Sequence, residues 1–126
     1  MEALGQHLLI ELYECDKDIL NDEKRVAEIL TSAAEVCGAT VLNTSSHKFS
    51  PQGVSAIIMI AESHFSIHTW PEYCYGACDV FTCGTTLKPD VAVDYLVKEF
   101  EAKNFTLHEI KRGTLKLPEG KKLTHK

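Results

Sequence analysis

The sequence predicts a two-layer α+β sandwich, with a mostly antiparallel sheet and two helices packed on one face. Three observations favour it: short apolar alternations typical of strands, two amphipathic helical stripes, and the element order β-α-β-β-β-β-α-β, in which helices and strands do not alternate strictly. The chain has 126 residues, so a single domain spanning 1–126 is expected. The uncovered sheet face should carry polar, aromatic and thiol side chains, as a partner interface or a site does.

The first third of the chain is predicted to form a strand followed by a helix. Residues 5–15 are predicted to form the strand, because apolar residues alternate there with polar or mixed positions. Asn21 is expected to cap the helix, and Gly38 is expected to end it. The predicted buried stripe of this helix is Val26, Ile29, Leu30, Ala33 and Cys37.

The rest of the chain supplies the remaining strands and the second helix. Residues 40–49 and 54–61 are predicted strands, separated by a Ser-Pro-Gln-Gly turn at 50–53. Strands at 65–70 and 76–83 follow, with a break at Pro71. Pro89 is expected to open the second helix, and residues 105–110 to form the last strand. The second helix should bury Val93, Leu96, Val97 and Phe100.

Charge is distributed unevenly along the chain. The net charge is −5, yet residues 111–126 hold six Lys and Arg against one acid, Glu119. Residues 1–110 therefore carry 7 basic and 17 acidic groups, a net −10. An acidic body argues against a nucleic-acid partner and is compatible with a cationic ligand. The basic tail is expected to be a solvated end.

We expect neither a membrane span nor an export signal in this chain. Its longest apolar run covers the six residues 56–61, against the ~20 that cross a bilayer. The N-terminus lacks a basic start followed by an apolar stretch. Five cysteines, an odd number, then indicate reduced thiols and not a disulfide scaffold. We expect a soluble, cytoplasmic protein.

Residues 61–64 carry the first chemical signal. They lie between two strong strand patterns, where the chain should turn, and contain no Gly, Pro or Asn to ease a turn. A strained backbone at Ser63 would favour an N→O acyl shift, in which the hydroxyl attacks the preceding carbonyl and the amide becomes an ester. A plain hairpin, in which Ser63 only caps a backbone group, is the alternative.

His68 is the second candidate, and its distance from Ser63 matters. On a straight strand these two side chains point to opposite faces, with Cα atoms roughly 16 Å apart. They can share a site only if the chain kinks sharply or if two copies combine, and a homodimer with composite sites is the simpler prediction. A turn centred on Glu62 and Ser63 would place Ser55 diagonally beside His68, as a possible acid–base relay.

A zinc site is a third possibility, and the spacing disfavours it. Its candidate ligands are His64, His68, Cys74, Cys78 and Cys83. Their order lacks the C-x2-C spacing of structural sites, and strand residues four apart lie about 13 Å from each other. We therefore expect no metal. The glycines form no phosphate-binding loop, and no G-x-S-x-G elbow is present.

Several segments resemble the prokaryotic S-adenosylmethionine decarboxylases. They are HKFSPQGVS (47–55), AESHFSIHTWPEY (61–73) and DVFTCG (79–84), together with LGQHLLIELYEC (4–15) and KRG (111–113). The resemblance implies a two-layer α+β fold that pairs as a dimer with shared active sites. It also implies self-cleavage between Glu62 and Ser63 into chains 1–62 and 63–126, which leaves on residue 63 a pyruvoyl group that forms a Schiff base with the substrate.

The same resemblance implies roles for the other candidates. His68 matches the proton acceptor in processing, Ser55 the hydroxyl that assists it, and Cys83 the proton donor to the substrate carbon. Phe49 and Glu72 match positions that stack on adenine and bind the ribose hydroxyls. The implied reaction is decarboxylation of S-adenosylmethionine to the aminopropyl donor for spermidine.

Two alternatives stay open beside this reading. Cys74, Gly76 and Cys78 depart from the family pattern near the substrate region, and some similar proteins resemble arginine or ornithine decarboxylases. Phe49 and Glu72 favour the nucleoside substrate. The other alternative is a binding homologue that keeps the fold but never cleaves.

Overall fold

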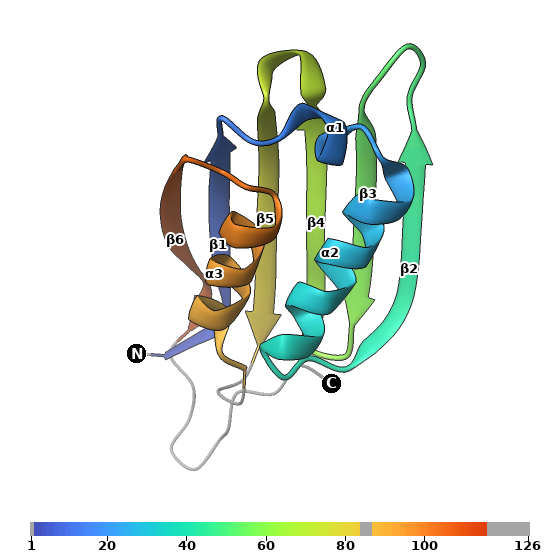
Figure 1. Cartoon of the computed structure of the whole chain (residues 1–126). Helices are drawn as coiled ribbons and strands as arrows, with labels where there is room; N and C mark the ends of the chain where they lie inside the picture. The colour runs from blue at the N-terminus through green and yellow to red at the C-terminus, as the bar shows by residue number, and fades with distance from the viewer. Residues whose placement is uncertain (1, 84–86, 116–126) are drawn as a thin grey trace.

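Six antiparallel strands form one sheet in the order β2-β3-β4-β5-β1-β6 (Figure 1). The computed structural model describes residues 2–83 and 87–115. Along the chain the elements are β1 (Glu2–Tyr13), α1 (Lys17–Leu20), α2 (Glu23–Val36), β2 (Val41–Lys48), β3 (Val54–Ile60), β4 (Ser63–Trp70), the 3-10 turn η1 (Pro71–Tyr73), β5 (Tyr75–Cys83), α3 (Pro89–Glu99) and β6 (Asn104–Leu115).

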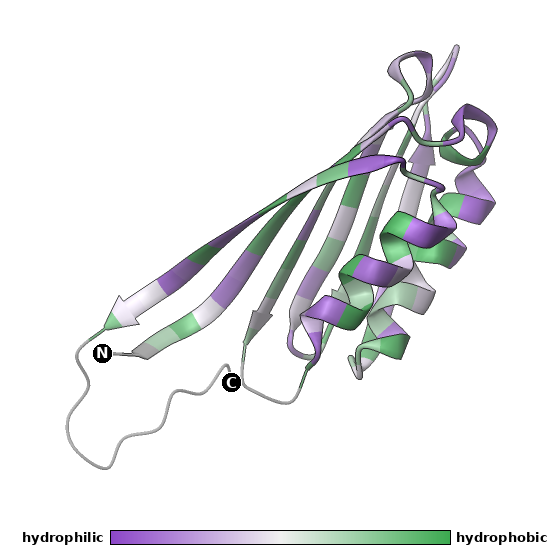
Figure 2. Cartoon of the chain, turned by 60° about the vertical axis from the view of Figure 1, so that its left-hand side comes forward, coloured by the Kyte–Doolittle hydropathy of each residue, from purple (hydrophilic) through white to green (hydrophobic). Residues whose placement is uncertain are grey.

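The helices lie on one face of the sheet and leave the other face uncovered (Figure 2). The predicted two-layer α+β fold is confirmed, and the structure adds the short helix α1, which sequence analysis missed. Asp16 caps α1, because its Oδ1 accepts hydrogen bonds from the N–H groups of Asp18 and Ile19. Four residues are too few to show helical periodicity, so only the cap could have indicated this helix. Among the described residues, no helix is long and apolar enough to cross a membrane.

The core lies between the helices and the covered face of the sheet. In β3 the burial alternates strictly, with Ile58 and Ile60 inside and Ile57 and Met59 exposed on the uncovered face. This period of two follows from the strand pleat. The predicted stripe of α2 is confirmed, since its members are all buried: Val26, Ile29, Leu30, Ala33 and Cys37. Each large apolar side chain buried this way contributes about 1.5–3 kcal/mol.

Several element boundaries differ from the predicted ones. Asp22, not Asn21, caps α2, because Asp22 Oδ1 accepts from the N–H of Arg25 at 3.1 Å. Asn21 instead accepts from the N–H of Gly53 at 3.0 Å, which ties α1 to the β2–β3 turn. The edge strand β6 runs to Leu115 because it pairs with β1 along its whole length. Residues 111–115 of the expected basic tail belong to this strand, and 116–126 lie outside the described residues.

Candidate active site

The β3–β4 hairpin holds Ser63 in a strained backbone conformation. Ile60 pairs with Ser63, so Ala61 and Glu62 form a two-residue turn. Ser63 has φ 145°, in the region that normally requires glycine. The strain expected at this serine is therefore present, although Ser63 and His64 belong to β4 and not to the turn.

The peptide bond before Ser63 is held by the end of β5. The backbone N–H of Cys83 donates a hydrogen bond of 3.0 Å to the carbonyl oxygen of Glu62. The Cys83 Sγ lies 3.5 Å from the Ser63 Oγ, and this thiol is buried. One residue thus polarises the Glu62 carbonyl through its backbone and places its thiol against the neighbouring hydroxyl.

Ser55 and His68 form a second pair, on β3 and β4. The Ser55 Oγ lies 2.7 Å from the His68 Nδ1. The expected proximity is confirmed, but the two residues are directly opposite and not diagonal. The reason is that the turn is centred one residue earlier than predicted, between Ala61 and Glu62. Such a shift moves the register by two residues and so leaves every side chain on its predicted face.

Two cavities on the uncovered face bring Ser63 and the Ser55–His68 pair onto one surface. One, of about 290 Å³, is lined by Asn43, Ser45, Ile57, Met59, Ser63 and His64. The other, of about 390 Å³, contains Ser55 and His68 and shares Ser45 and Ile57 with the first. The expectation that Ser63 and His68 open to opposite faces is therefore wrong. The positive φ of Ser63 removes it from the regular alternation of the strand.

The remaining candidates lie at the other end of the sheet. Phe49 follows the end of β2, and Glu72 lies in η1 after the end of β4, whereas Ser63 begins β4 (Figure 1). Both side chains are exposed, and the Phe49 ring packs edge-on against His47 with centroids 4.6 Å apart. The eight residues of β4 separate the two ends by about 23 Å. Within a single chain, Phe49 and Glu72 therefore do not come near Ser63.

A network around Asp79, which sequence analysis missed, joins three strands on the uncovered face. The Asp79 Oδ2 accepts from the Nε2 atoms of His7 on β1 (2.6 Å) and His64 on β4 (2.9 Å). The Ser66 hydroxyl donates to Oδ1. Alternation along single strands puts these residues on one face, but only the register across β1, β5 and β4 shows that they meet.

The hydrogen bonds of this network keep Asp79 ionised. Burial by itself would raise the pKa of this carboxyl group. Hydrogen bonds from His64, Ser66 and His7 outweigh that effect and hold the pKa well below its usual range.

His7, His64 and Asp79 are also the described residues that come closest to a metal site, with their ligand atoms within 4.8 Å of one another. However, the Arg112 Nη1 lies 3.2 Å from the His7 Nδ1. Because a guanidinium only donates, this Nδ1 accepts and the ring proton is on Nε2. The His7 Nε2 therefore donates to Asp79 and has no lone pair for a metal. The cationic Arg112 further disfavours a metal ion there.

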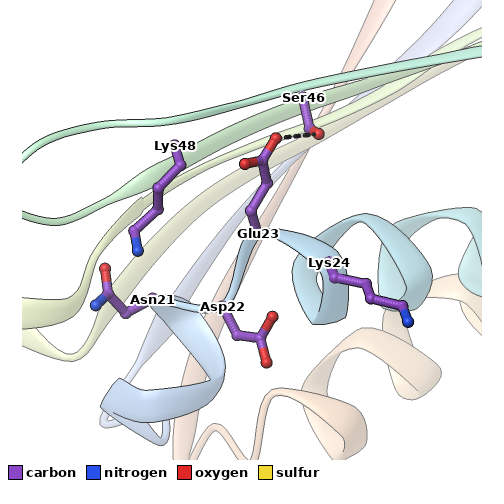
Figure 3. A pocket seen from close by; sticks show the side chains of 6 residues that line it. All are labelled: Asn21, Asp22, Glu23, Lys24, Ser46 and Lys48. Atoms are coloured by element: carbon purple, nitrogen blue, oxygen red, sulfur yellow. Dashed lines mark hydrogen bonds between the residues drawn. The ribbon is translucent and has the colours of Figure 1, made fainter.

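A larger cavity of about 680 Å³ lies between the start of α2 and β2, toward the end of the sheet opposite Ser63 (Figure 3). Its lining residues are Asn21, Asp22, Glu23, Lys24, Ser46 and Lys48. Both acids are already engaged, since Asp22 caps α2 and Glu23 accepts from Ser46 at 2.7 Å. It contains none of the candidate residues, and its mixed charges favour no particular ligand.

The fold and the site together define a small α+β sandwich enzyme with hydroxyl, imidazole and thiol groups on its uncovered sheet face. A family model described as S-adenosylmethionine decarboxylase matches residues 6–113. The chain therefore belongs to the S-adenosylmethionine decarboxylase family and is an enzyme, a decarboxylase. The resemblance carried by the sequence motifs is confirmed.

Individual relatives agree with this membership. The S-adenosylmethionine decarboxylase proenzyme of Carboxydothermus hydrogenoformans is 55% identical over 115 residues, 91% of each chain. The proenzyme of the same name from Thermodesulfovibrio yellowstonii is 48% identical over 126 residues, 100% of this chain and 93% of that one. The crystal structure of the adenosylmethionine decarboxylase from Aquifex aeolicus superposes with a TM-score of 0.87 at 30% identity, covering 96% of this chain and 100% of the other.

Proposed function

We propose that the chain cleaves itself between Glu62 and Ser63, converts Ser63 into a pyruvoyl group, and then decarboxylates S-adenosylmethionine. The observation that carries this proposal is the hydrogen bond from the Cys83 N–H to the Glu62 carbonyl, next to a serine with φ 145°. Relatives that are about 50% identical in sequence and are named proenzymes support it.

The first step is an N→O acyl shift at the strained peptide bond. The Ser63 Oγ attacks the Glu62 carbonyl carbon, the C–N bond breaks, and the nitrogen takes up the hydroxyl proton. The Cys83 N–H, 3.0 Å from the carbonyl oxygen, stabilises the negative charge that develops there. Conversion of the amide into an ester releases the backbone strain at Ser63.

The second step is elimination of the ester. A base removes the Ser63 Cα proton, and the Cα electrons form a double bond to Cβ as the Glu62 carboxylate leaves. His68 is our candidate base. Because it lies about 16 Å along the strand from Ser63 of its own chain, it acts on Ser63 of the second copy in the dimer proposed below. Ser55, 2.7 Å from the His68 Nδ1, orients the ring. The products are chain 1–62 and a dehydroalanine at residue 63. Tautomerisation to an imine and hydrolysis then release ammonia and leave the pyruvoyl group.

The residues around Ser63 fit such a group. When formed, it would supply a ketone that condenses with the substrate amine, with loss of water, and so provides the acceptor for the electrons left by the departing CO₂. Cys83 is suited to return a proton to the substrate carbon, since its Sγ lies 3.5 Å from the Ser63 Oγ. A half-exposed aromatic ring at Phe49 and a carboxylate at Glu72 suit the adenine and the ribose hydroxyls of a nucleoside.

We propose in addition that the working unit is a homodimer with shared sites. Phe49 and Glu72 lie about 23 Å along the sheet from Ser63, and His68 about 16 Å, so one substrate cannot touch all of them within a protomer. If the uncovered faces of two copies pack against each other with their β4 strands running in opposite directions, the end of one copy that carries Phe49 and Glu72 meets the Ser63 end of the other. Exposed apolar side chains on that face, among them Ile57, Met59 and Trp70, favour such packing.

Mass spectrometry under denaturing conditions tests the cleavage. Two fragments that correspond to 1–62 and 63–126 are expected, the second without an α-amino group. An intact chain after long incubation would contradict the proposal and favour a binding homologue.

Release of CO₂ from carboxyl-labelled S-adenosylmethionine, compared with labelled arginine and ornithine, tests the substrate. Cleavage together with release from arginine or ornithine alone would keep the processing and overturn the substrate. The product of the proposed reaction carries the aminopropyl group that spermidine synthesis requires.

A further inference from the structure

His64 follows Ser63 in the chain, and its side chain is fixed by a group on another strand. Its Nε2 lies 2.9 Å from the Asp79 Oδ2. The imidazole is about a third exposed and the carboxylate about a quarter exposed. This bond therefore anchors the backbone of residue 64 to β5, in addition to the ladder between β4 and β5.

Ser63 is consequently held from both sides. On its N-terminal side, the Glu62 carbonyl is fixed by the Cys83 N–H at 3.0 Å. On its C-terminal side, His64 is fixed by Asp79. A residue with φ 145° persists only where its surroundings determine the conformation more strongly than the backbone resists it. Removal of either anchor allows Ser63 to relax toward an ordinary strand conformation.

We propose that His64 and Asp79 are positioning residues for self-cleavage, which hold Ser63 in the strained conformation from which the N→O acyl shift occurs. This inference rests on the self-cleavage proposed above. Neither residue exchanges a proton with the reacting atoms in this role. The strength of the anchor comes from an ionised acceptor, since a hydrogen bond to a charged group is stronger than one between neutral groups.

His7 supplies a matched control, because it donates to the same Asp79 oxygen from β1, at 2.6 Å, and has no backbone link to Ser63. The two histidines thus support the same carboxylate from opposite neighbours. Asparagine is therefore substituted at both His64 and His7. If only the His64 variant cleaves slowly, the cause is the lost anchor on residue 64 and not a general weakening of the network around Asp79.

The experiment follows cleavage of the full-length proenzyme after a pulse of cell-free synthesis, on denaturing gels. The glutamine Nε2 has the reach of the histidine Nε2, whereas the asparagine amide is shorter. We expect His64→Asn to slow cleavage by about tenfold or more, and His64→Gln to restore it to within about threefold of the parent. We expect His7→Asn to stay within about twofold of the parent. Circular dichroism checks that each variant is folded.

Hydroxylamine identifies the affected step, because it cleaves esters and leaves ordinary amides intact. If His64 positions Ser63 for the shift, His64→Asn accumulates no ester, and hydroxylamine does not accelerate its cleavage. A variant impaired in elimination, such as His68→Ala, would instead be cleaved by hydroxylamine.

Three results would overturn the inference. They are parent-like cleavage of His64→Asn, equal slowing in His7→Asn, and cleavage of His64→Asn restored by hydroxylamine. If the parent chain itself never cleaves, the proposed function fails first. If the parent cleaves and one of these three results is found, only the positioning role fails.

Discussion

The Cys83 backbone N–H donates a 3.0 Å hydrogen bond to the Glu62 carbonyl oxygen, while the Cys83 thiol lies 3.5 Å from the Ser63 hydroxyl. A single residue therefore offers two groups to the two reactions proposed above. In the proposed self-cleavage, the backbone N–H acts on the carbonyl that is attacked. In the proposed decarboxylation, the thiol is placed for proton transfer to the substrate carbon. Because the first group belongs to the main chain, the two contributions can be separated by substitution.

Cys83→Ser should separate self-cleavage from decarboxylation. The backbone N–H is unchanged, so cleavage should stay within about fivefold of the parent. A serine hydroxyl is a far weaker acid than a thiol, so turnover of S-adenosylmethionine should fall by about 100-fold. Denaturing gels measure the first quantity and CO₂ release the second. Equal losses in both would contradict a separate role for the thiol.

Ser55→Ala should slow elimination without slowing the acyl shift. The Ser55 Oγ is 2.7 Å from the His68 Nδ1, and its loss leaves the ring free to rotate. Cleavage should slow by about tenfold, with an accumulated ester that hydroxylamine converts into two chains. Ser55→Thr keeps the hydroxyl and should process nearly as the parent does. Failure of Ser55→Thr to restore cleavage would argue against orientation by the hydroxyl.

Most of the fold was predictable because local patterns determine it. The alternation in β3 and the stripe of α2 each identify both the element and its buried face. Boundaries were less predictable where two neighbouring residues could perform the same task. Asn21 and Asp22 are both good caps, and only the structure shows that Asp22 receives the Arg25 N–H while Asn21 receives that of Gly53.

In the candidate site, too, local contacts were predictable and contacts between distant parts of the sequence were not. Ser55 and His68 were predicted as neighbours because a hairpin links them through a short local register. Asp79, His7 and His64 were not, because the meeting of β1, β5 and β4 depends on pairings between distant parts of the sequence. The strain at Ser63 was expected from a turn that lacks turn-forming residues. The return of its side chain to the face of His68 follows from its actual φ.

Mixing two inactive variants should recover activity if the sites are shared between copies. Ser63→Ala lacks the proposed pyruvoyl precursor but keeps Glu72, and Glu72→Ala has the reverse defect. In a mixed dimer, one site would combine an intact Ser63 with an intact Glu72 from the other copy. Co-expression should therefore give about a quarter of parent activity, because half of the dimers are mixed and each has one competent site.

The subunit composition provides the control for this experiment. Analytical ultracentrifugation should show dimers for each variant alone and for the mixture, and each variant alone should be inactive. A different affinity tag on each variant, used in two successive purifications, isolates the mixed dimers. An inactive mixture of proven mixed dimers would place every group of the site within one copy.

Because Asp79 is ionised in the folded state, the free energy of unfolding should fall as the pH is lowered. Hydrogen bonds from His64, Ser66 and His7 overcome the effect of burial and hold the pKa of this carboxyl group below its usual range in the folded state. An ordinary aspartate in the unfolded chain has a pKa of about 3.9. A group whose pKa is lowered by folding stabilises the protein at pH values above its pKa in the unfolded chain. This contribution is lost as the pH falls toward its pKa in the folded protein.

Asp79→Asn should therefore be less stable than its parent at pH 5, and the difference in the free energy of unfolding should narrow between about pH 4 and pH 3. Urea unfolding of both proteins in a Ser63→Ala background, which keeps the chain uncleaved, measures this difference. The other carboxylates are shared by the two proteins and cancel, so a gap that stays constant down to pH 3 would contradict a lowered pKa at Asp79.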